Sequence, residues 1–489
     1  MDFVAPSLAV GSLADAQNVA YCRANGIGAV LSLLQSDFDA GEHHATIPLR
    51  DGEPLPPSAV ACATAFVARQ LQAGRKVLVH CQMGLSRSPA IIAAYLHEYA
   101  GMSLGDALAW VRTRRTAAAP HPVLVDSLYR LYDPAAEQAP PEMLDLSANE
   151  NPLGPSPRAM AALVAAAGNC HRYPDRHGRA LRLALADQLG FAPSQLILGN
   201  GSCELLDLIA RAMLAPGDQA LIATPSFLPY QSAIERAHGE VVAVPLRADY
   251  HCDLAGMAQR IGSRSRLVIL GHPNNPTGCA LGAEELAHFL DALPEQVVVL
   301  IDEAYRDYVT RPDAADAMAL VQQGRNVVAL RTFSKVHALA GLRIGYAAAR
   351  PDLAARIEAI RPHYNTNHAA QAAALACLGD HAHVADSLAV NRSGLAALAS
   401  GCAELGLAYV ASQANFLLVE TGDADGIAAA LLSRGVRVKS GAPFGLPQHI
   451  RISVGTPACN GRCLQALQAV LADRQNNNPI NTRQGAQAW

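Results

Sequence analysis

The 489-residue chain is poor in charge and in aromatic side chains. Charged residues make up 16% and aromatic residues 5% of it, while hydrophobic residues reach 51%. Such a composition excludes an intrinsically disordered chain. The net charge is −4, so no overall basic field indicates a nucleic-acid partner. No apolar run reaches the roughly 18 residues that a membrane-spanning helix needs, so no membrane partner is expected.

The chain also lacks the signals of export, of disulfide bonding and of metal binding. The first residues have neither the basic stretch nor the apolar stretch of a signal peptide, which predicts a cytoplasmic protein. The eleven cysteines follow no metal-type or disulfide-type spacing. In a reducing compartment most of them are expected to be buried thiols, and no metal site is expected. Cys81 is the exception.

What remains is the pattern of an α/β protein with more than one domain. At about 150 residues per domain, the length suggests roughly three domain-sized units. Residues 1–133 are expected to form a small α/β domain, and residues 134–142 a linker rich in Pro, Ala and Glu. Residues 143–473 are expected to form a larger α/β domain. The tail 474–489 is rich in Asn and Gln and is expected to be disordered.

Apolar runs of strand length alternate with helical stretches in both domains. This alternation predicts a mostly parallel sheet in the larger domain, followed by a smaller α+β part from about residue 351. The expected strands are 30–34, 76–80, 195–198, 219–222, 241–244, 267–270, 297–301 and 327–330.

Cys81 begins a run that is typical of a phosphate-binding loop, His-Cys-Gln-Met-Gly-Leu-Ser-Arg-Ser over 80–88. The run lies between an expected strand and an expected helix, where backbone N–H groups favour an anion. The same field lowers the pKa of a thiol, so Cys81 is the candidate nucleophile. Arg87 is expected to hold two phosphate oxygens, and Ser88 to hydrogen-bond the thiolate.

A leaving alkoxide or phenoxide needs a proton donor, and Asp51 is the candidate acid, with Asp37 and Asp39 as earlier alternatives. The signature of Cys, five residues and Arg resembles that of the dual-specificity protein phosphatases, over about residues 3–132. The resemblance implies a phosphomonoesterase. A buried structural Cys81 and an inactive phosphatase-like binding module are the alternatives, and either a phosphoprotein or a small metabolite could be the substrate.

A second candidate site surrounds Lys335, which lies in a turn between small residues after an expected strand. An amine held still and partly desolvated suits Schiff-base chemistry with pyridoxal 5'-phosphate. Arg343, eight residues further, and the Ser334 hydroxyl are expected to bind the cofactor phosphate. Asp302 ends another strand, where its carboxylate would pair with the pyridine nitrogen, and Tyr305 would hydrogen-bond the ring oxygen.

Three further loops at strand ends are expected to complete the cofactor site, as open α/β sheets bind ligands there. Asn275 can reach the same ring oxygen. The backbone amides of Ser202 and Cys203, at a Gly turn into a helix, suit the phosphate. Phe227 can stack on the ring. The alternatives to these cofactor roles are that Lys335 is an ordinary solvated lysine and that Phe227 packs in the hydrophobic core.

Residues 143–473 resemble the fold type I, aspartate aminotransferase-like enzymes and, among them, the histidinol-phosphate aminotransferases. The resemblance rests on these runs in order, listed by residue number: 146–154, 172–175, 273–278, 302–305 and 331–343. It implies a homodimer in which Tyr173 reaches the neighbour's cofactor phosphate, although Tyr173 could also be a surface turn residue. It implies that Arg451 holds an anionic group of the substrate and that Asn415 lies near the substrate or a supporting turn.

One position departs from that family. The family has Arg after a Gly-Ile/Val-x-Val strand, where this chain has Lys439, which keeps the charge without the bidentate fork. The run 441–447 is somewhat similar to that of the threonine-phosphate decarboxylases. We therefore expect an amino donor and a keto acceptor, with a phosphorylated amino compound favoured. A decarboxylase, or an aminotransferase tethered to a regulatory protein phosphatase, stays open.

Overall fold

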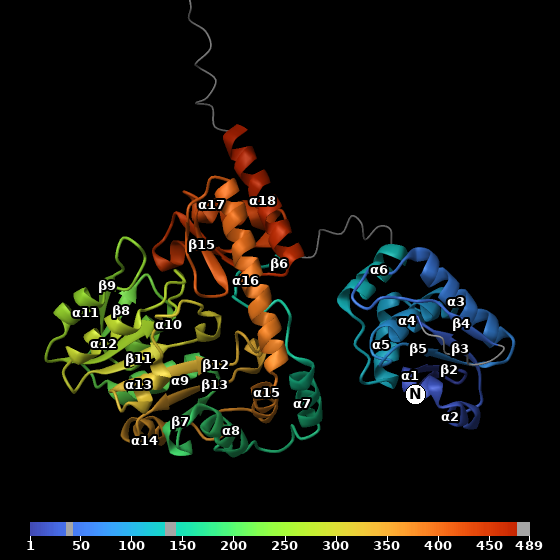
Figure 1. Cartoon of the computed structure of the whole chain (residues 1–489), viewed down its shortest axis with the longest axis horizontal. Coiled ribbons are helices and arrows are strands. Elements are labelled where there is room, and N and C mark those ends of the chain that lie inside the picture. The colour runs from blue at the N-terminus through green and yellow to red at the C-terminus, as the bar shows by residue number, and fades with distance from the viewer. Residues whose placement is uncertain (36–42, 133–142, 477–489) are drawn as a thin grey trace, which may run out of the picture. The chain divides into compact units, whose positions relative to one another are not determined.

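The computed structural model describes residues 1–35, 43–132 and 143–476. The chain divides into two compact units, Met1–Pro141 and Glu142–Trp489 (Figure 1). The expected linker, 134–142, lies outside the described residues, as do Asp37 and Asp39. The expectation of a disordered tail from residue 474 is wrong for its first three residues, because the last helix, α18, continues to Asn476. The rest of that tail lies outside the described residues.

The smaller unit contains one five-stranded sheet in the order β1-β2-β5-β3-β4. Only the β1–β2 pair is antiparallel, so the central β5 has a parallel neighbour on each side. Consecutive residues of β5 are buried, as expected for a strand covered on both faces. The strands are β1 (Asp2–Ala5), β2 (Leu8–Gly11), β3 (Ile27–Ser32), β4 (His44–Thr46) and β5 (Lys76–His80).

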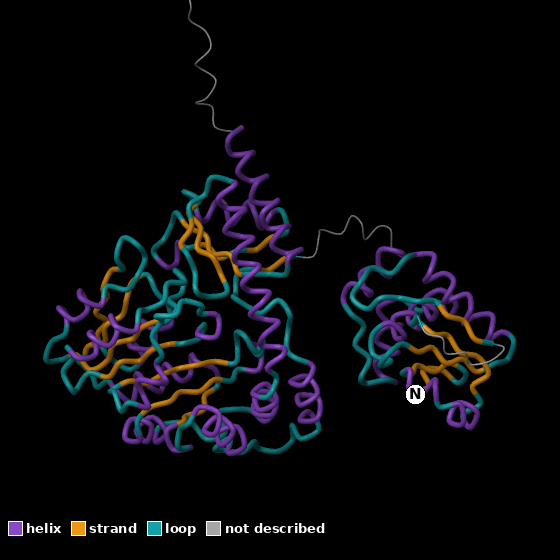
Figure 2. Tube along the Cα trace, in the orientation of Figure 1, coloured by secondary structure: helices purple, strands orange, loops and turns teal. Residues whose placement is uncertain are grey.

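Helices cover this sheet and share a core of aliphatic side chains with it (Figure 2). The centre of that core is α4, whose consecutive residues from Ser88 to Ala94 are all buried. The carboxyl end of β5 and the start of α4 are therefore held rigidly, with the candidate phosphate loop between them. The helices are α1 (Leu13–Gln17), α2 (Val19–Ala24), α3 (Pro57–Gln72), α4 (Arg87–Ala100), α5 (Leu104–Arg114) and α6 (Pro122–Tyr132).

The larger unit is built on a seven-stranded sheet in the order β7-β13-β12-β11-β10-β8-β9. All its strands are parallel except β13, which pairs antiparallel with β12 and with β7. The strands are β7 (Leu196–Gly199), β8 (Gln219–Thr224), β9 (Glu240–Pro245), β10 (Ser265–Gly271), β11 (Val298–Asp302), β12 (Val327–Thr332) and β13 (Gly345–Ala349).

Both faces of this sheet are buried, because alternate side chains of each strand enter two separate hydrophobic cores. In β10, Leu267 and Ile269 join one core, while Val268 and Leu270 join the other. The first core includes α9 (Gly201–Met213), α10 (Pro229–Arg236) and α14 (Pro351–Ala359). The second includes α8 (Arg179–Leu189), α11 (Leu254–Arg260), α12 (Ala283–Asp291), α13 (Ala317–Gln322) and α15 (His368–Leu378), with α7 (Pro157–Ala167) packed on α15.

The smaller α+β part begins later than expected. Because α14 and α15 pack on the large sheet, the transition falls in the long helix α16 (His381–Glu404), not at residue 351. Figure 1 shows α16 running from the region of β15 toward α7 and α15. The part contains an antiparallel sheet in the order β14-β15-β18-β17, beside a separate β16–β6 pair. Its elements are β6 (Leu144–Asp145), β14 (Tyr409–Val410), β15 (Phe416–Glu420), α17 (Ala424–Ser433), β16 (Val436–Arg437), β17 (Lys439–Ser440), β18 (His449–Ser453) and α18 (Pro457–Asn476).

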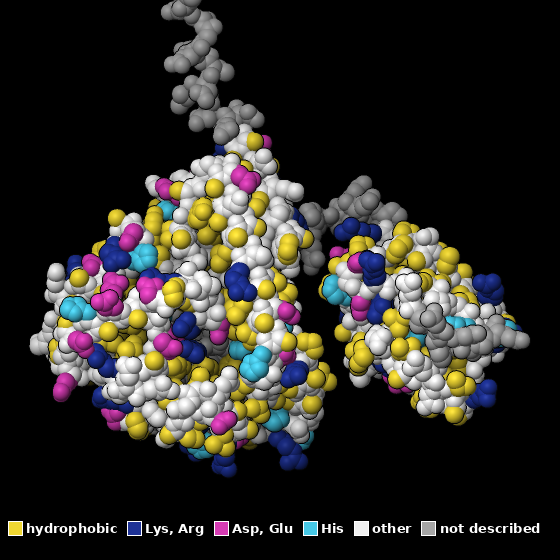
Figure 3. Space-filling view, viewed as in Figure 1, with side chains coloured by type: hydrophobic (Ala, Val, Ile, Leu, Met, Phe, Trp, Pro, Cys, Tyr) yellow, Lys and Arg dark blue, Asp and Glu magenta, His cyan; other side chains and the backbone are white. Residues whose placement is uncertain are grey.

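In the part of the larger unit that the structure describes, four short 3-10 helices connect these elements. They are η2 (Pro193–Gln195), η3 (Arg306–Tyr308), η4 (Ala340–Leu342) and η5 (Ala442–Phe444). Within the described ranges, no helix has the length and apolarity to cross a membrane. The viewed faces of both units carry Lys and Arg interspersed with Asp and Glu (Figure 3). The cytoplasmic location stays a prediction.

Candidate functional site

The first candidate site lies where β5 ends and α4 begins. Cys81 directly follows β5, Arg87 is the first residue of α4, and the phosphate loop between them is held at both ends by buried elements. The Ser88 hydroxyl donates a hydrogen bond to the Cys81 Sγ at 3.1 Å, within the buried core. The structure thus brings together the predicted nucleophile and its predicted hydrogen-bond donor.

The surroundings of Cys81 favour a thiolate. Burial by itself raises the pKa of this thiol, but hydrogen bonds from the Ser88 hydroxyl and from the backbone N–H groups of Ser88 and Gly84 outweigh it. The Arg87 cation also stabilises the thiolate, so the pKa of Cys81 lies below that of an ordinary thiol. A thiolate is the reactive nucleophile in displacement at phosphorus.

Asp51 and Arg87 lie next to each other across this loop. The Arg87 Nε is 3.7 Å from the Asp51 Oδ2, and another guanidinium nitrogen donates to the Leu49 carbonyl at 2.9 Å. The Ser86 hydroxyl donates to the Asp51 Oδ1 at 2.6 Å. The Asp51 side chain is 45% exposed, so its carboxyl group is accessible to a leaving group.

Arg115, which lies outside the motif, and Gly84, which lies within it, shape this loop. Arg115 donates from its Nε to the Gly84 carbonyl at 2.6 Å and from a terminal nitrogen to the Met83 carbonyl at 3.0 Å. Gly84 has φ +68°, and a Cβ there would lie 2.5 Å from the Gly11 carbonyl oxygen, so only glycine fits. Ser86 links the loop to Asp51. Arg115 carried no signal in the sequence, because it lies outside the motif.

The second candidate site is a cavity of about 430 Å³ in the larger unit, which we call the cofactor cavity. Its lining comes from loops at the carboxyl ends of the parallel strands and from the smaller α+β part. It gathers all but two of the side chains predicted for this site. Those predicted residues are Ser202, Cys203, Phe227, Asn275, Asp302, Tyr305, Ser334, Lys335, Arg343, Lys439 and Arg451.

Asp302 is the buried carboxyl group of this cavity. It ends β11, is 5% exposed, and accepts hydrogen bonds from the Tyr230 hydroxyl at 3.0 Å and from the Ala304 N–H at 3.1 Å. Burial nevertheless raises the pKa of Asp302 to about 6. A cationic ring N–H bound beside it would supply the missing counter-charge.

The Lys335 amine lies close to Asn149 and Tyr305. Its Nζ donates to the Ala148 and Asn149 carbonyls at 3.1 and 3.2 Å, and it lies 5.6 Å from the centroid of the Tyr305 ring. The Asn149 amide donates to the Tyr305 hydroxyl at 2.9 Å. The structure therefore holds this amine in the cavity through exchangeable hydrogen bonds to main-chain oxygens.

Arg343 lies against the N-terminus of α9, at the turn that we call the phosphate cradle, residues 199–203. A Cβ added to Gly201 would meet an Arg343 guanidinium nitrogen at 2.4 Å, so the glycine allows this contact. Arg343 also donates to the Ser334 hydroxyl at 3.5 Å and to the Ala340 carbonyl at 2.8 Å. A guanidinium, a hydroxyl and the free amides of a helix N-terminus together suit a phosphate.

Arg451 and Lys439 face each other as neighbours on β18 and β17. Arg451 donates to the Asn275 Oδ1 and to the Ser147 carbonyl, both at 2.5 Å, and is 5% exposed. Its Nε has no hydrogen-bond partner among the described residues. Phe444 packs over the same guanidinium at 5.9 Å. The cavity thus contains two cationic side chains, Lys439 and Arg451, in addition to Arg343.

Two predicted residues lie outside the lining of the cavity. Asn415 is buried, and its amide donates to the Asn149 carbonyl at 3.0 Å, so it contacts a supporting turn. Tyr173 is 83% exposed and stacks on Tyr364 with ring centroids 4.8 Å apart. Its predicted role toward a neighbouring subunit stays a prediction.

Tyr230, Asn149 and Phe444 also line this site, although the sequence assigned them no role. Asn149 and Phe444 lie in runs that carry the resemblance to known families, but nothing in the sequence indicated their contacts. Tyr230 lies in α10, 72 residues before Asp302, and its pairing with that carboxyl group comes only from the packing of α10 on the sheet.

Comparisons with known proteins match both units. The family model of aminotransferase class I and II matches residues 141–467, and that of the dual specificity phosphatase catalytic domain matches residues 8–133. A histidinol-phosphate aminotransferase from Anaeromyxobacter sp. (strain Fw109-5) is 42% identical over 328 residues, which cover 67% of this chain and 90% of that protein. One from Symbiobacterium thermophilum is 43% identical over 333 residues, covering 68% and 91%.

Solved structures agree with this match. The histidinol-phosphate aminotransferase from Sinorhizobium meliloti, in complex with pyridoxal-5'-phosphate, is 30% identical, with a TM-score of 0.64. The match covers 69% of this chain and 94% of that one. A Thermus thermophilus aspartate aminotransferase, 24% identical with a TM-score of 0.62, shares the fold and covers 68% of this chain and 98% of that one.

The family implies pyridoxal phosphate, and the cofactor cavity fits that group. Among the described residues the buried Asp302 makes no ion pair, the Lys335 amine reaches into the cavity, and Arg343 lies at a cradle in which only glycine leaves room beside it. The chain therefore belongs to the class I and II aminotransferases, and it carries a dual specificity phosphatase catalytic domain in its smaller unit.

Proposed function

We propose that this protein is a bifunctional enzyme that transaminates a phosphorylated amino compound and hydrolyses a phosphomonoester. The observation that carries the first activity is the gathering of Lys335, Asp302, Arg343 and Arg451 around one cavity of about 430 Å³. An amine base, a buried carboxyl group and two separate anion-binding cations are what the transamination of an anionic substrate requires.

In the proposed transamination, bound pyridoxal phosphate supplies the electron sink that lets a proton leave the substrate Cα. Asp302 pairs with the ring nitrogen, and Tyr305 and Asn275 hydrogen-bond the ring oxygen. The cradle at Ser202 and Cys203, with Arg343 and Ser334, binds the cofactor phosphate; Phe227 stacks on the ring. The Lys335 Nζ would accept the proton from the substrate Cα and deliver it to the cofactor carbon C4′.

The substrate is held by the other pair of cations. Arg451 and Lys439 line the side of the cavity formed by β17 and β18, and we assign the substrate's anionic groups to them. The similarity to histidinol-phosphate aminotransferases supports a phosphorylated amino compound such as histidinol phosphate. The phosphorylated amino compound forms when an amino donor such as glutamate passes its amino group to the phosphorylated ketone, which is the keto acceptor. We propose a homodimer in which Tyr173 reaches the partner's cofactor phosphate.

In the proposed phosphatase, the Cys81 thiolate attacks phosphorus and the bond from phosphorus to the ester oxygen breaks. Asp51 protonates the departing oxygen, and Arg87 with the loop amides binds the other phosphate oxygens. Water then releases inorganic phosphate and restores the thiolate, which Ser88 stabilises. The lowered pKa of Cys81 and the 2.6 Å hydrogen bond by which Ser86 holds the exposed Asp51 at the loop support these roles.

The two activities suit consecutive steps, because one site would make a phosphorylated amine and the other would remove its phosphate. For histidinol phosphate, the combined product is histidinol, which places the chain in histidine biosynthesis. A regulatory protein phosphatase tethered to the aminotransferase is the competing account. This account predicts that phosphotyrosine peptides are hydrolysed and that amino-alcohol phosphates are not.

The test uses the Cys81→Ser protein, in which phosphate groups survive. We would incubate it with 2-oxoglutarate and either histidinol phosphate or O-phosphothreonine, and identify the products by mass spectrometry. Formation of glutamate and a phosphorylated ketone supports the proposal. Release of CO2 from phosphothreonine would instead establish a decarboxylase. Turnover of neither compound contradicts the assigned substrate class.

A further inference from the structure

The phosphate cradle is held by a side chain of its own helix. The Asn200 N–H, directly before α9, donates to the Glu204 Oε2 at 2.6 Å. The Asn200 side chain makes no capping hydrogen bond of its own. Glu204 therefore fixes the backbone at the point where the amides of Gly201 and Ser202 become free for an anion.

Glu204 is in turn held from a distant segment. The Asn365 Nδ2 donates to the same Glu204 oxygen at 2.6 Å and to the Leu198 carbonyl, in β7, at 3.3 Å. One amide group thus connects the strand before the cradle with the helix after it. It comes from a residue 161 positions further along the chain.

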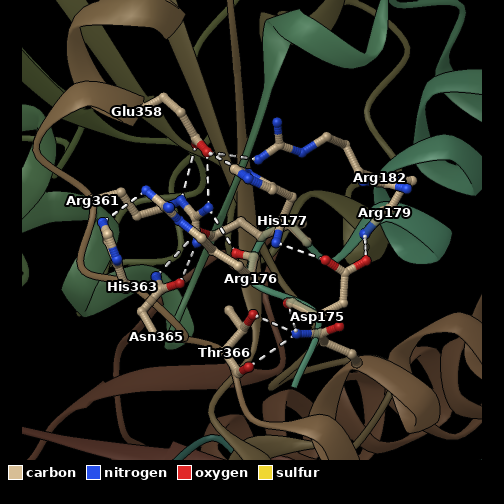
Figure 4. A network of polar contacts seen from close by, with 12 residues as sticks. Asp175, Arg176, His177, Arg179, Arg182, Glu358, Arg361, His363, Asn365 and Thr366 are labelled. Atoms are coloured by element: carbon tan, nitrogen blue, oxygen red, sulfur yellow. Dashed lines mark hydrogen bonds and ion pairs between the residues drawn. The ribbon is translucent and has the colours of Figure 1, made fainter. Parts of the chain in front are cut away.

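Arg361 holds Asn365. Its guanidinium is 7% exposed and donates to the Asn365 Oδ1, while two other nitrogens donate to the Glu358 carboxylate at 3.0 and 2.8 Å. Figure 4 shows Arg361 between Glu358 and Asn365, with dashed contacts to both. Arg182 gives Glu358 a further ion pair at 3.1 Å. The cradle is therefore anchored to a partly buried charged cluster in which Arg361 is the buried member.

The same guanidinium holds the loop of Tyr173. A terminal nitrogen of Arg361 donates to the Arg176 carbonyl at 2.9 Å, and Tyr364 stacks on Tyr173. Arg361 thus contacts both the segment that presents the exposed Tyr173 and, through Asn365, the cradle of its own subunit.

We propose that Glu204, Asn365 and Arg361 are positioning residues for the cofactor phosphate: they fix the cradle without touching the cofactor. The inference rests on the proposed function, because it takes the cradle to bind the phosphate of pyridoxal phosphate. It follows that breaking the link weakens binding of the phosphate group in particular. Binding of a ring that has no phosphate should be unaffected.

The experiment measures the dissociation constants of pyridoxal phosphate and of pyridoxal, by absorbance titration of the apoprotein. Asn365→Ala and Glu204→Ala each remove one partner of the hydrogen bond between Asn365 and Glu204. Each variant is expected to weaken pyridoxal phosphate binding about tenfold. Pyridoxal binding should change by less than about twofold. The double variant should lose less than the sum of the two single losses, because both single variants remove the hydrogen bond between Asn365 and Glu204.

Asn326→Ala is the matched control. Its amide also donates two hydrogen bonds to main-chain carbonyls, those of Glu295 and Val297, but it lies just before β12, at the opposite strand end from the cradle. This variant should lose similar stability and keep normal binding of both ligands. Arg361→Lys, which keeps the charge and loses the fork, should weaken pyridoxal phosphate binding at least as much as Asn365→Ala.

Three results would overturn the inference while the proposed function stands: unchanged pyridoxal phosphate binding in both single variants, an equal loss for pyridoxal, or additive losses in the double variant. Failure of the wild-type apoprotein to take up pyridoxal phosphate would instead refute the proposed function itself. Glu204→Ala keeps the test available if Asn365→Ala does not fold, because Glu204 is only half-buried.

Discussion

The reactivity of Cys81 depends on a small number of hydrogen bonds inside a buried loop. Burial opposes the thiolate, and Ser88 and the loop amides reverse that effect. The residue types were evident in the sequence, because the run 80–88 contains both the nucleophile and its donors. The balance between burial and hydrogen bonding was not evident, since it depends on how closely α4 packs on β5.

Ser88→Ala should raise the pKa of Cys81. In the wild type the Ser88 hydroxyl stabilises the thiolate, so its removal should shift the pH profile of Cys81 alkylation to higher pH. The measurement is the pH dependence of iodoacetate alkylation of Cys81, resolved by peptide mass spectrometry, with the exposed Cys62 as internal control. An alkylation profile that stays unchanged in the variant would contradict the assigned role of Ser88.

Asp302 should make the apoprotein less stable as the pH rises from about 4 to about 6. Its pKa is raised from 3.8 to about 6, so the folded state binds the proton more tightly than the unfolded state. The difference corresponds to about 3 kcal/mol, lost above pH 6. Asp302→Asn should remove this dependence and raise the thermal midpoint at pH 7. Asp187→Asn, on an exposed position of α8, is the control; equal midpoints for Asp302→Asn and wild type at pH 7 would refute the effect.

At the level of elements, strand ends position both candidate sites, and this was predictable. The alternation of short apolar runs with helices predicted the parallel strands from β7 to β12 within a few residues. The antiparallel β13 was missed, because its Ala-rich sequence carries no strand signal. The boundary at residue 351 was wrong, because α14 and α15 have apolar faces that fit either part and only packing assigns them to the large sheet.

The loop before α4 couples Ser86 to the proposed acid, which gives a prediction about this turn. Ser86→Ala should slow hydrolysis of alkyl phosphates about tenfold or more and leave aryl phosphates with good leaving groups nearly unaffected. The reason is that the Ser86 hydroxyl orients Asp51, which matters only where the leaving oxygen needs a proton. Asp51→Asn should show the same selectivity, and Ser127→Ala, elsewhere in the unit, should show none. Equal losses on both ester types in Ser86→Ala would indicate a general collapse of the loop.

On the scale of the whole molecule, the two units have separate cores, and each brings together most of the side chains predicted for its candidate site. Most of those residues lie in short runs with chemically specific residue types, which is why the sequence indicated them. The contacts that anchor them, such as Arg115 on the phosphate loop and Arg361 behind the cradle, come from residues far away in the chain. No local pattern in the sequence indicates such contacts.

Separate cores predict that the two activities can be removed one at a time. Lys335→Ala should abolish transamination and leave the hydrolysis of an aryl phosphate unchanged, because Lys335 and both of its main-chain acceptors belong to the larger unit. Cys81→Ser should abolish hydrolysis and leave the uptake of pyridoxal phosphate unchanged. Both can be followed by absorbance on the same preparations. Loss of both activities in either variant would contradict independent sites.

The most direct test of the bifunctional account supplies imidazole-acetol phosphate and glutamate to the wild-type protein and to Cys81→Ser, with products identified by mass spectrometry. The account predicts histidinol and inorganic phosphate from the wild type, and histidinol phosphate from the variant. Histidinol phosphate left intact by the wild type would contradict the proposal that both sites act on one compound.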